Sequence, residues 1–155
     1  MKKKQNYTVG EAQKKLEYYC AYQDRCHVEV IAKLKEMGMI PKARDKIVAD
    51  LIRANYLNET RFSKSFARGK FRIKKWGKNR IIRELKKRGI SDFNIKLGLK
   101  EISENIYQST FYDLFEKRKK ELEELSKVEQ KKKIFYYFSY RGWEHSKIYE
   151  ALSEL

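Results

Sequence analysis

Apolar residues recur at helical spacing in three places along the chain, each time just before a glycine. The same pattern, an adjacent apolar pair followed by a large apolar residue, precedes the glycine in Val30-Ile31 and Leu34 before Gly38, Ile81-Ile82 and Leu85 before Gly89, and Ile134-Phe135 and Phe138 before Gly142. These positions fall on one face of a helix with 3.6 residues per turn. A glycine directly after such a face is typical of a helix C-terminus, where the backbone turns left-handed.

The pattern behaves as an internal repeat. The three glycines lie 51 and 53 residues apart, and apolar residues follow each of them at matching distances: ten residues on, Val48, Leu99 and Leu152, and thirteen residues on, Leu51, Ile102 and Leu155. Repeats of this length indicate stacked helical units. We therefore predict an all-α fold, an elongated array of three tandem three-helix repeats covering residues 6–57, 58–106 and 107–155.

Capping residues predict where most of the nine helices begin. Thr8 with Glu11, and Ser126 with Glu129, form capping boxes, and the only proline, Pro41, suits a first helical turn. Asn58 and Ser91 are suited to cap two further helices. The expected helices are about 10–23, 27–37, 41–54, 59–76, 78–88, 92–104, 110–125, 128–141 and 144–155. No segment has the alternating pattern of a strand.

The charge balance indicates an anionic partner. The 155 residues include 37 Lys and Arg but only 21 Asp and Glu, a formal net charge of +16. Nucleic acid, a membrane surface or an acidic protein could each balance this charge. No apolar run approaches the roughly 20 residues that cross a bilayer. The basic start, residues 1–5, leads into no signal-peptide core, so we expect a disordered N-terminus and a cytoplasmic protein.

Chemistry-bearing residues are scarce. Cys20, Cys26 and His27 do not have the spacing of a zinc site, and no second cluster completes four ligands. The sequence contains no Gly-rich phosphate loop and no nucleophile motif. We expect reduced cysteines, no metal, no cofactor and no enzymatic activity.

Positive charge is concentrated in the middle of the chain. Between residues 61 and 88, Glu84 is the only acidic residue among thirteen Lys and Arg, so this segment carries +12 of the net +16. A face that only solvates a helix normally mixes charges of both signs. Like charges at this density repel one another unless an anion neutralises them, which makes the segment a candidate binding surface.

The aromatic residues are more readily explained by packing. Phe62 and Phe66 lie four residues apart on one expected helix and suit its core. For Trp76, core or loop packing is favoured over stacking on a base. Tyr136, Tyr137 and Tyr140 flank an apolar face, and we expect partly buried packing rather than a platform for bases.

A resemblance to a known family gives these features a context. The segment Tyr56–Phe62, followed by Arg68, Lys70, Trp76-Gly77, Arg80-Ile81 and Glu84–Ile90, resembles the RecX family. Typical members have Leu-Asp-Asp-x-x-Phe, then a basic run, then Leu-x-x-Lys-Gly-Ile. This chain has Asn58-Glu59 in place of the paired aspartates, and an Asn cap with a first-turn carboxylate can start the helix equally well.

The resemblance implies a non-enzymatic, monomeric, curved regulator of the RecA recombinase. Such a protein would lie in the groove of the RecA–DNA filament, contact RecA and single- or double-stranded DNA, and limit filament growth, ATP hydrolysis and strand exchange. The expected contact residues come from the basic run: Arg61, Lys64, Arg68, Lys70, Arg72, Lys74, Lys75, Trp76, Lys78, Arg80, Arg83 and Lys87.

Two other interpretations remain open. A general DNA- or RNA-binding helical protein without RecA specificity would have the same charge, although the expected helix 78–88 is better suited to phosphates than to base edges. A membrane-surface protein is less well supported, because the basic run has no continuous apolar stripe to enter lipid.

Overall fold

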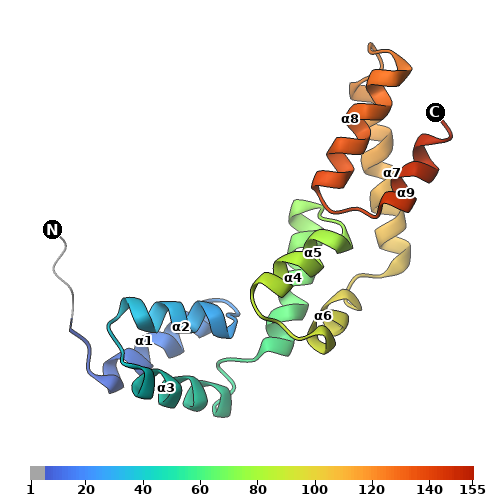
Figure 1. The fold of residues 1–155 in the computed structure, drawn as a ribbon. Coiled ribbons are helices and arrows are strands. Elements are labelled where there is room, and N and C mark those ends of the chain that lie inside the picture. Colours follow the sequence, from blue (N-terminus) through green and yellow to red (C-terminus); the bar gives the residue numbers. More distant parts are fainter. Residues whose placement is uncertain (1–5) are drawn as a thin grey trace, which may run out of the picture.

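The computed structural model describes residues 6–155, which form nine helices and no strand (Figure 1). They fall into three successive groups of three: α1 (Val9–Tyr22), α2 (His27–Glu36) and α3 (Pro41–Arg53); α4 (Glu59–Lys74), α5 (Lys78–Lys87) and α6 (Asp92–Leu99); α7 (Glu104–Glu121), α8 (Lys127–Tyr140) and α9 (His145–Leu152). The all-α, three-unit prediction is confirmed. The expectation for residues 1–5 lies outside the described residues.

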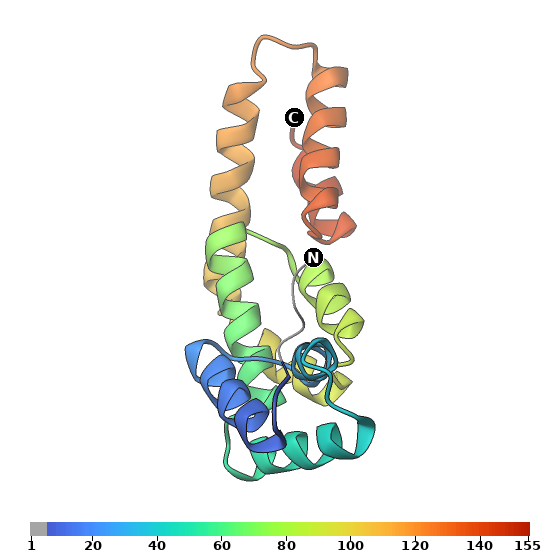
Figure 2. The same ribbon diagram turned by 90° about the vertical axis from the view of Figure 1, so that its left-hand side faces the viewer.

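The three units follow one another along a curved molecule. In Figure 1 the unit of α1–α3 lies at one end, α4–α6 in the middle and α7–α9 at the other end. Seen after a quarter turn, α7 and α8 extend beyond α5, away from the first unit (Figure 2). The middle unit, with its excess of positive charge, therefore lies midway along an extended surface.

Each repeated glycine ends its helix in the same way. Gly38, Gly89 and Gly142 have φ values of +78°, +70° and +84°, in the left-handed region. The next residue each time donates its N–H to the carbonyl five residues before it: Met39 to Leu34 at 3.0 Å, Ile90 to Leu85 at 3.1 Å and Trp143 to Phe138 at 3.0 Å. This is the 6→1 bond of a Schellman motif. Leu34, Leu85 and Phe138 are all fully buried, so they are equivalent core positions.

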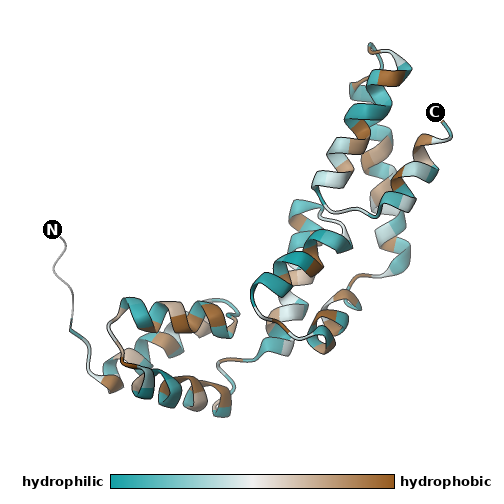
Figure 3. Ribbon diagram, in the orientation of Figure 1, coloured by the Kyte–Doolittle hydropathy of each residue, from teal (hydrophilic) through white to brown (hydrophobic). Residues whose placement is uncertain are grey.

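The apolar side chains form two cores rather than three. One lies within the first unit and includes Leu16, Leu34 and Leu51. The other runs through the second and third units, and Cys26 of the first unit also packs into it. In Figure 3 apolar residues occupy the helix faces that turn toward one another within each unit. The second and third units are thus joined by shared packing.

The junctions between units also repeat. At the first junction, the backbone N–H of His27 donates to Glu59 at 3.1 Å, and the two side chains lie 3.6 Å apart. At the second, the ammonium group of Lys78 lies 3.1 Å from the carboxylate of Glu104. Each contact joins the start of one unit's second helix to the start of the next unit's first helix. Consecutive units are therefore attached by equivalent helix ends.

The helix bounds differ from expectation mainly between the second and third units. The sixth helix ends at Leu99 rather than near Glu104, and α7 spans Glu104–Glu121 rather than 110–125. The division expected between residues 106 and 107 therefore falls inside α7. The reason is an aromatic stripe, Tyr107, Phe111 and Phe115, which lies at helical spacing and is buried along its length.

Candidate nucleic-acid interface

The twelve residues expected to bind DNA or the filament lie on two successive helices and the link between them. Six cations are on α4, Lys75 and Trp76 form the link, and four cations are on α5. Lys75 ends α4 in a left-handed conformation, with φ at +58°. The short link therefore turns the chain sharply, and both cationic helices belong to the middle unit.

Arg61 attaches the first unit to the second. Its Nε lies 2.6 Å from the Asp24 carboxylate, and its Nη2 donates at 3.1 Å to the carbonyls of Asn55 and Tyr56. A guanidinium with three such partners has most of its donors satisfied inside the protein. Arg61 is thus placed to hold the inter-unit link together.

Three further candidates have carboxylate partners. Arg68 lies 2.6 Å from Glu101, Lys78 lies 3.1 Å from Glu104, and Lys87 lies 4.0 Å from Glu84. The hydrogen bond from Lys78 lowers the pKa of Glu104, and the hydrogen bond from Arg88 lowers the pKa of Glu84. An anion that binds these cations has to compete with a carboxylate.

Trp76 lies at the centre of an aromatic and cationic cluster. The Arg80 guanidinium stacks over its ring at 4.3 Å from the centroid, and the Lys70 ammonium lies 5.1 Å from the same centroid. The indole also meets Phe66 edge-on at 6.3 Å, and both are half-buried against the core. The prediction that Trp76 packs beside the core is confirmed, as is the core position of Phe62.

Seven of the cationic candidates have no carboxylate within ion-pair distance among residues 6–155, and two of them, Lys70 and Arg80, lie over the Trp76 ring. The other five are Lys64, Arg72, Lys74, Lys75 and Arg83. All but Lys64 are exposed. Cations that are exposed and unpaired retain their charge for a phosphate, and neutralising them would relieve their mutual repulsion. These five, the unpaired cations, are the part of the basic run best suited to bind an anion.

The start of α5 is closed off by the third unit. The N–H groups of Gly77 and Asn79 donate to the carbonyls of Arg141 and Gly142 at 2.8 and 2.9 Å. The N–H of Lys78 donates to the Tyr107 hydroxyl at 3.0 Å, and that hydroxyl donates to Glu144. Burial, together with this bond to Glu144, raises the pKa of Tyr107. Since these N–H groups are satisfied, the helix end is not an anion site.

The third unit holds functional candidates that the sequence interpretation missed. Tyr136 and Tyr140 are 67% and 70% exposed, so the expectation that they pack partly buried is wrong. Tyr137 does pack, and the guanidinium groups of Arg118 and Arg141 both lie over its ring. The four-residue spacing of the two exposed rings, outside the repeated apolar face, is the signal that could have identified them.

The described residues contain no other obvious chemical centre. Among residues 6–155, no group of three or more His, Cys, Asp or Glu side chains is arranged to hold a metal ion. Nor does any helix within that range have the length and apolar character needed to cross a membrane. Burial raises the pKa of the Cys20 and Cys26 thiols to about 11, so both cysteines are inert near neutral pH.

The fold and the cationic middle unit define a class: a curved, all-helical repeat protein with a basic surface at its centre. The family model of the second three-helix domain of RecX matches residues 58–99, the segment that carries α4, α5 and α6. The crystal structure of RecX from Lactobacillus salivarius superimposes with a TM-score of 0.80 at 21% identity, covering 95% of this chain and 97% of that one. The chain belongs to the RecX family.

Sequence relatives extend the match beyond the middle unit. The regulatory protein RecX of Enterococcus faecalis is 34% identical over 116 residues, which is 75% of this chain and 39% of that protein. The regulatory protein RecX of Pelodictyon phaeoclathratiforme is 29% identical over 126 residues, 80% of this chain and 76% of that protein. The aligned part spans less than two fifths of the first curated relatives' length.

Proposed function

We propose that this protein regulates RecA by binding within the RecA–DNA filament, where it limits filament growth, ATP hydrolysis and strand exchange. The observation that carries the proposal is the set of five unpaired cations, Lys64, Arg72, Lys74, Lys75 and Arg83, midway along a curved molecule of the RecX fold. It would act as a cytoplasmic monomer, without a cofactor and without chemistry of its own.

The extended shape supports a filament as the partner. A filament presents the same protein surface at regular intervals, so a molecule built of three similar units can contact several protomers at once. Each additional contact is then intramolecular and raises the overall affinity without any single strong site. The unpaired cations of the middle unit would face the DNA, and the first and third units would contact RecA.

The alternative is a general DNA- or RNA-binding protein without RecA specificity. The exposed cations of α4 and α5 are compatible with it, because phosphate contacts carry no information about the partner. What separates the two is a response that requires RecA.

The test is the RecA-dependent ATPase on single-stranded DNA, with this protein titrated in at less than one molecule per RecA protomer. We expect ATP hydrolysis and strand exchange to fall at these ratios, because blocking a growing filament affects many protomers. Undiminished ATPase and strand exchange at saturating protein, together with intact DNA binding, would contradict the proposal and favour the alternative.

A further inference from the structure

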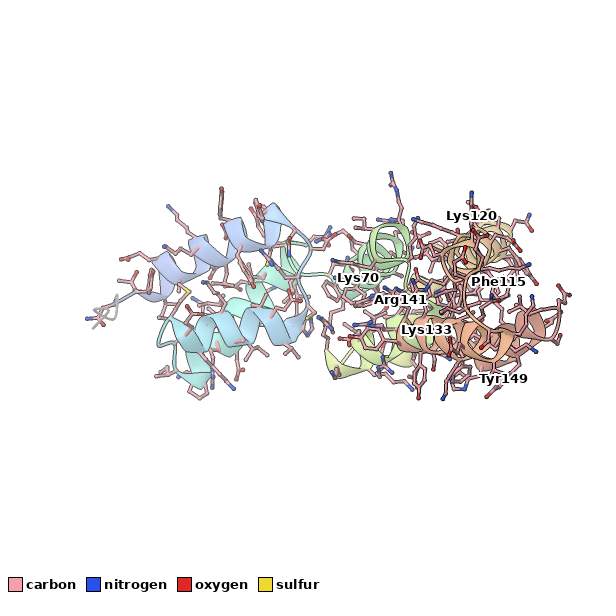
Figure 4. All side chains as sticks on the ribbon, turned by 90° about the horizontal axis from the view of Figure 1, so that it is seen from above. Lys70, Phe115, Lys120, Lys133, Arg141 and Tyr149 are labelled. Atoms are coloured by element: carbon pink, nitrogen blue, oxygen red, sulfur yellow. The ribbon has the colours of Figure 1, made fainter. Side chains whose placement is uncertain are left out.

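An open hollow lies on the third unit, between α7 and α8. It is lined by Arg118, Lys133, Tyr136, Tyr137, Tyr140 and Arg141. All but Arg118 belong to α8 or to the residue that ends it. In Figure 4, Lys70, Arg141 and Lys133 follow one another in this projection, from the middle unit into the third. Arg80 of α5 lies over the Tyr140 ring, so the hollow, here called the tyrosine hollow, lies next to the basic middle unit.

Two tyrosine rings in this hollow are available to a ligand. Tyr136 and Tyr140 are 67% and 70% exposed, although they lie one helical turn apart on the same side of α8. The buried face of that helix is formed by other residues, Ile134 and Phe138 among them. Neither exposed ring is needed for the core, so both can bind a flat partner.

The cations in the hollow are only partly neutralised. The guanidinium groups of Arg118 and Arg141 lie over the packed Tyr137 ring, at 5.1 and 3.9 Å from its centroid. Arg118 has a carboxylate partner in Glu121 at 2.9 Å, but no ion pair within residues 6–155 involves Lys133 or Arg141. No carboxylate lines the hollow. The hollow thus combines uncompensated positive charge with aromatic faces.

The hollow is continuous with the aromatic cluster of the middle unit. Arg80 stacks over Trp76 at 4.3 Å and over Tyr140 at 5.0 Å, and its Nη1 donates to the Tyr140 carbonyl at 3.3 Å. The Nε atoms of Arg80 and Arg118 are both buried without a hydrogen-bond partner. A row of alternating rings and guanidinium groups therefore runs from the end of α4 to the end of α8.

We infer that the tyrosine hollow is a base-stacking site for single-stranded nucleic acid. Exposed aromatic faces in a cationic groove are what unpaired bases and their phosphates require, because bases stack on the rings while cations neutralise the backbone. Duplex DNA offers only phosphates here, since its bases already stack on one another. An acidic protein segment would satisfy the charge but would leave the exposed faces of the two rings uncovered.

The inference rests on the nucleic-acid part of the proposed function and not on RecA. It adds a second contact on the third unit, distinct from the unpaired cations of the middle unit, and it predicts a preference for single strands. The two proposals can therefore fail separately. Loss of RecA inhibition would leave the stacking site untouched, and absence of stacking would leave filament binding through the middle unit intact.

The test measures the anisotropy of labelled oligo(dT) and of a duplex of equal length, each titrated with the full chain. The variant carries Tyr136→Leu and Tyr140→Leu, which keep apolar bulk but remove the rings. We expect oligo(dT) affinity to fall at least about tenfold, given the usual worth of base–aromatic stacking, and duplex affinity to stay within about twofold. In a separate variant, Lys133→Ala should lower the slope of log oligo(dT) affinity against log salt by about 0.7, the contribution of one phosphate.

The matched control is Tyr149→Leu, an exposed tyrosine of the same unit that lies outside the hollow. It should leave both affinities unchanged, and circular dichroism should show that all variants keep their helices. Unchanged oligo(dT) binding in the double variant, or an equal loss on duplex, would overturn the inference. Poly-glutamate that displaces labelled oligo(dT) as strongly as unlabelled oligo(dT) does would also overturn it, provided that the double variant no longer binds poly-glutamate. The hollow would then be a site for an acidic peptide.

Discussion

At the scale of single residues, the junction between the second and third units depends on two positions with no room for a side chain. A Cβ at Gly77 would lie 2.5 Å from the carbonyl oxygen of Gly142. A Cβ at Gly142 would overlap the amide nitrogen of Arg80 and lie 2.7 Å from its Cα. Both neighbours are backbone atoms, which cannot move aside cheaply. The close approach lets the carbonyls of residues 141 and 142 cap α5.

Replacing Gly142 by Ala should therefore destabilise the protein more than the same change at Gly38. Both glycines have positive φ, a conformation that costs an L-residue about 1–2 kcal/mol. Around Gly38 a new Cβ meets nothing within 4 Å, so Gly38→Ala should show only this cost. Gly142→Ala should lower the free energy of unfolding further, as measured by urea denaturation. Equal losses in the two variants would mean that the junction is looser than described.

At the scale of elements, α4 and α5 divide their cations between two roles. Arg61, Arg68 and Lys78 have protein carboxylates as partners, whereas Arg72, Lys74 and Lys75 do not. The first set joins helices or units, and the second is free to bind phosphate. Sequence alone does not separate the two sets, because their partners Asp24, Glu101 and Glu104 lie about 26–37 residues away along the chain.

Removing the unpaired cations should change how DNA binding depends on salt. On single-stranded DNA, the triple variant Arg72→Ala, Lys74→Ala, Lys75→Ala should lower the slope of log affinity against log salt by about 2, since each lost phosphate contact removes about 0.7 through counterion release. The control removes the same charge from the first unit, with Lys35, Lys42 and Lys46 changed to Ala; all three are exposed there. A slope that falls equally in both variants would show that only net charge matters.

Prediction from sequence succeeds at this scale where a local pattern determines the structure. The glycine repeat specifies its three helix ends because the left-handed turn and the buried face are both encoded within nine residues. The start of α7 is missed because it depends on Tyr107. The Tyr107 ring is buried against Trp143, which follows the end of α8, with 4.5 Å between the ring centroids. The basic run identifies the middle unit, but which of its cations have carboxylate partners emerges only from the tertiary structure.

At the scale of the whole molecule, the repeated junctions determine an extended shape. Each unit is attached to the next through helix starts, His27 with Glu59 and Lys78 with Glu104, so the units continue in one direction instead of folding back. The second and third units share one hydrophobic core, so they form a more continuous body than the first and second units do. A curved molecule with its unpaired cations at the centre can place them toward DNA while both ends meet protein.

The measurement that tests this account most directly is capture of the protein on single-stranded DNA, with and without a RecA filament assembled by a non-hydrolysable nucleotide. Salt is raised until binding to bare DNA is lost, because that binding depends on counterion release. The account predicts that the protein stays on the RecA filament at this salt, since the proposed contacts of the first and third units with RecA would add to the affinity. Loss from filament and bare DNA at the same salt would contradict it and leave a protein that recognises DNA alone.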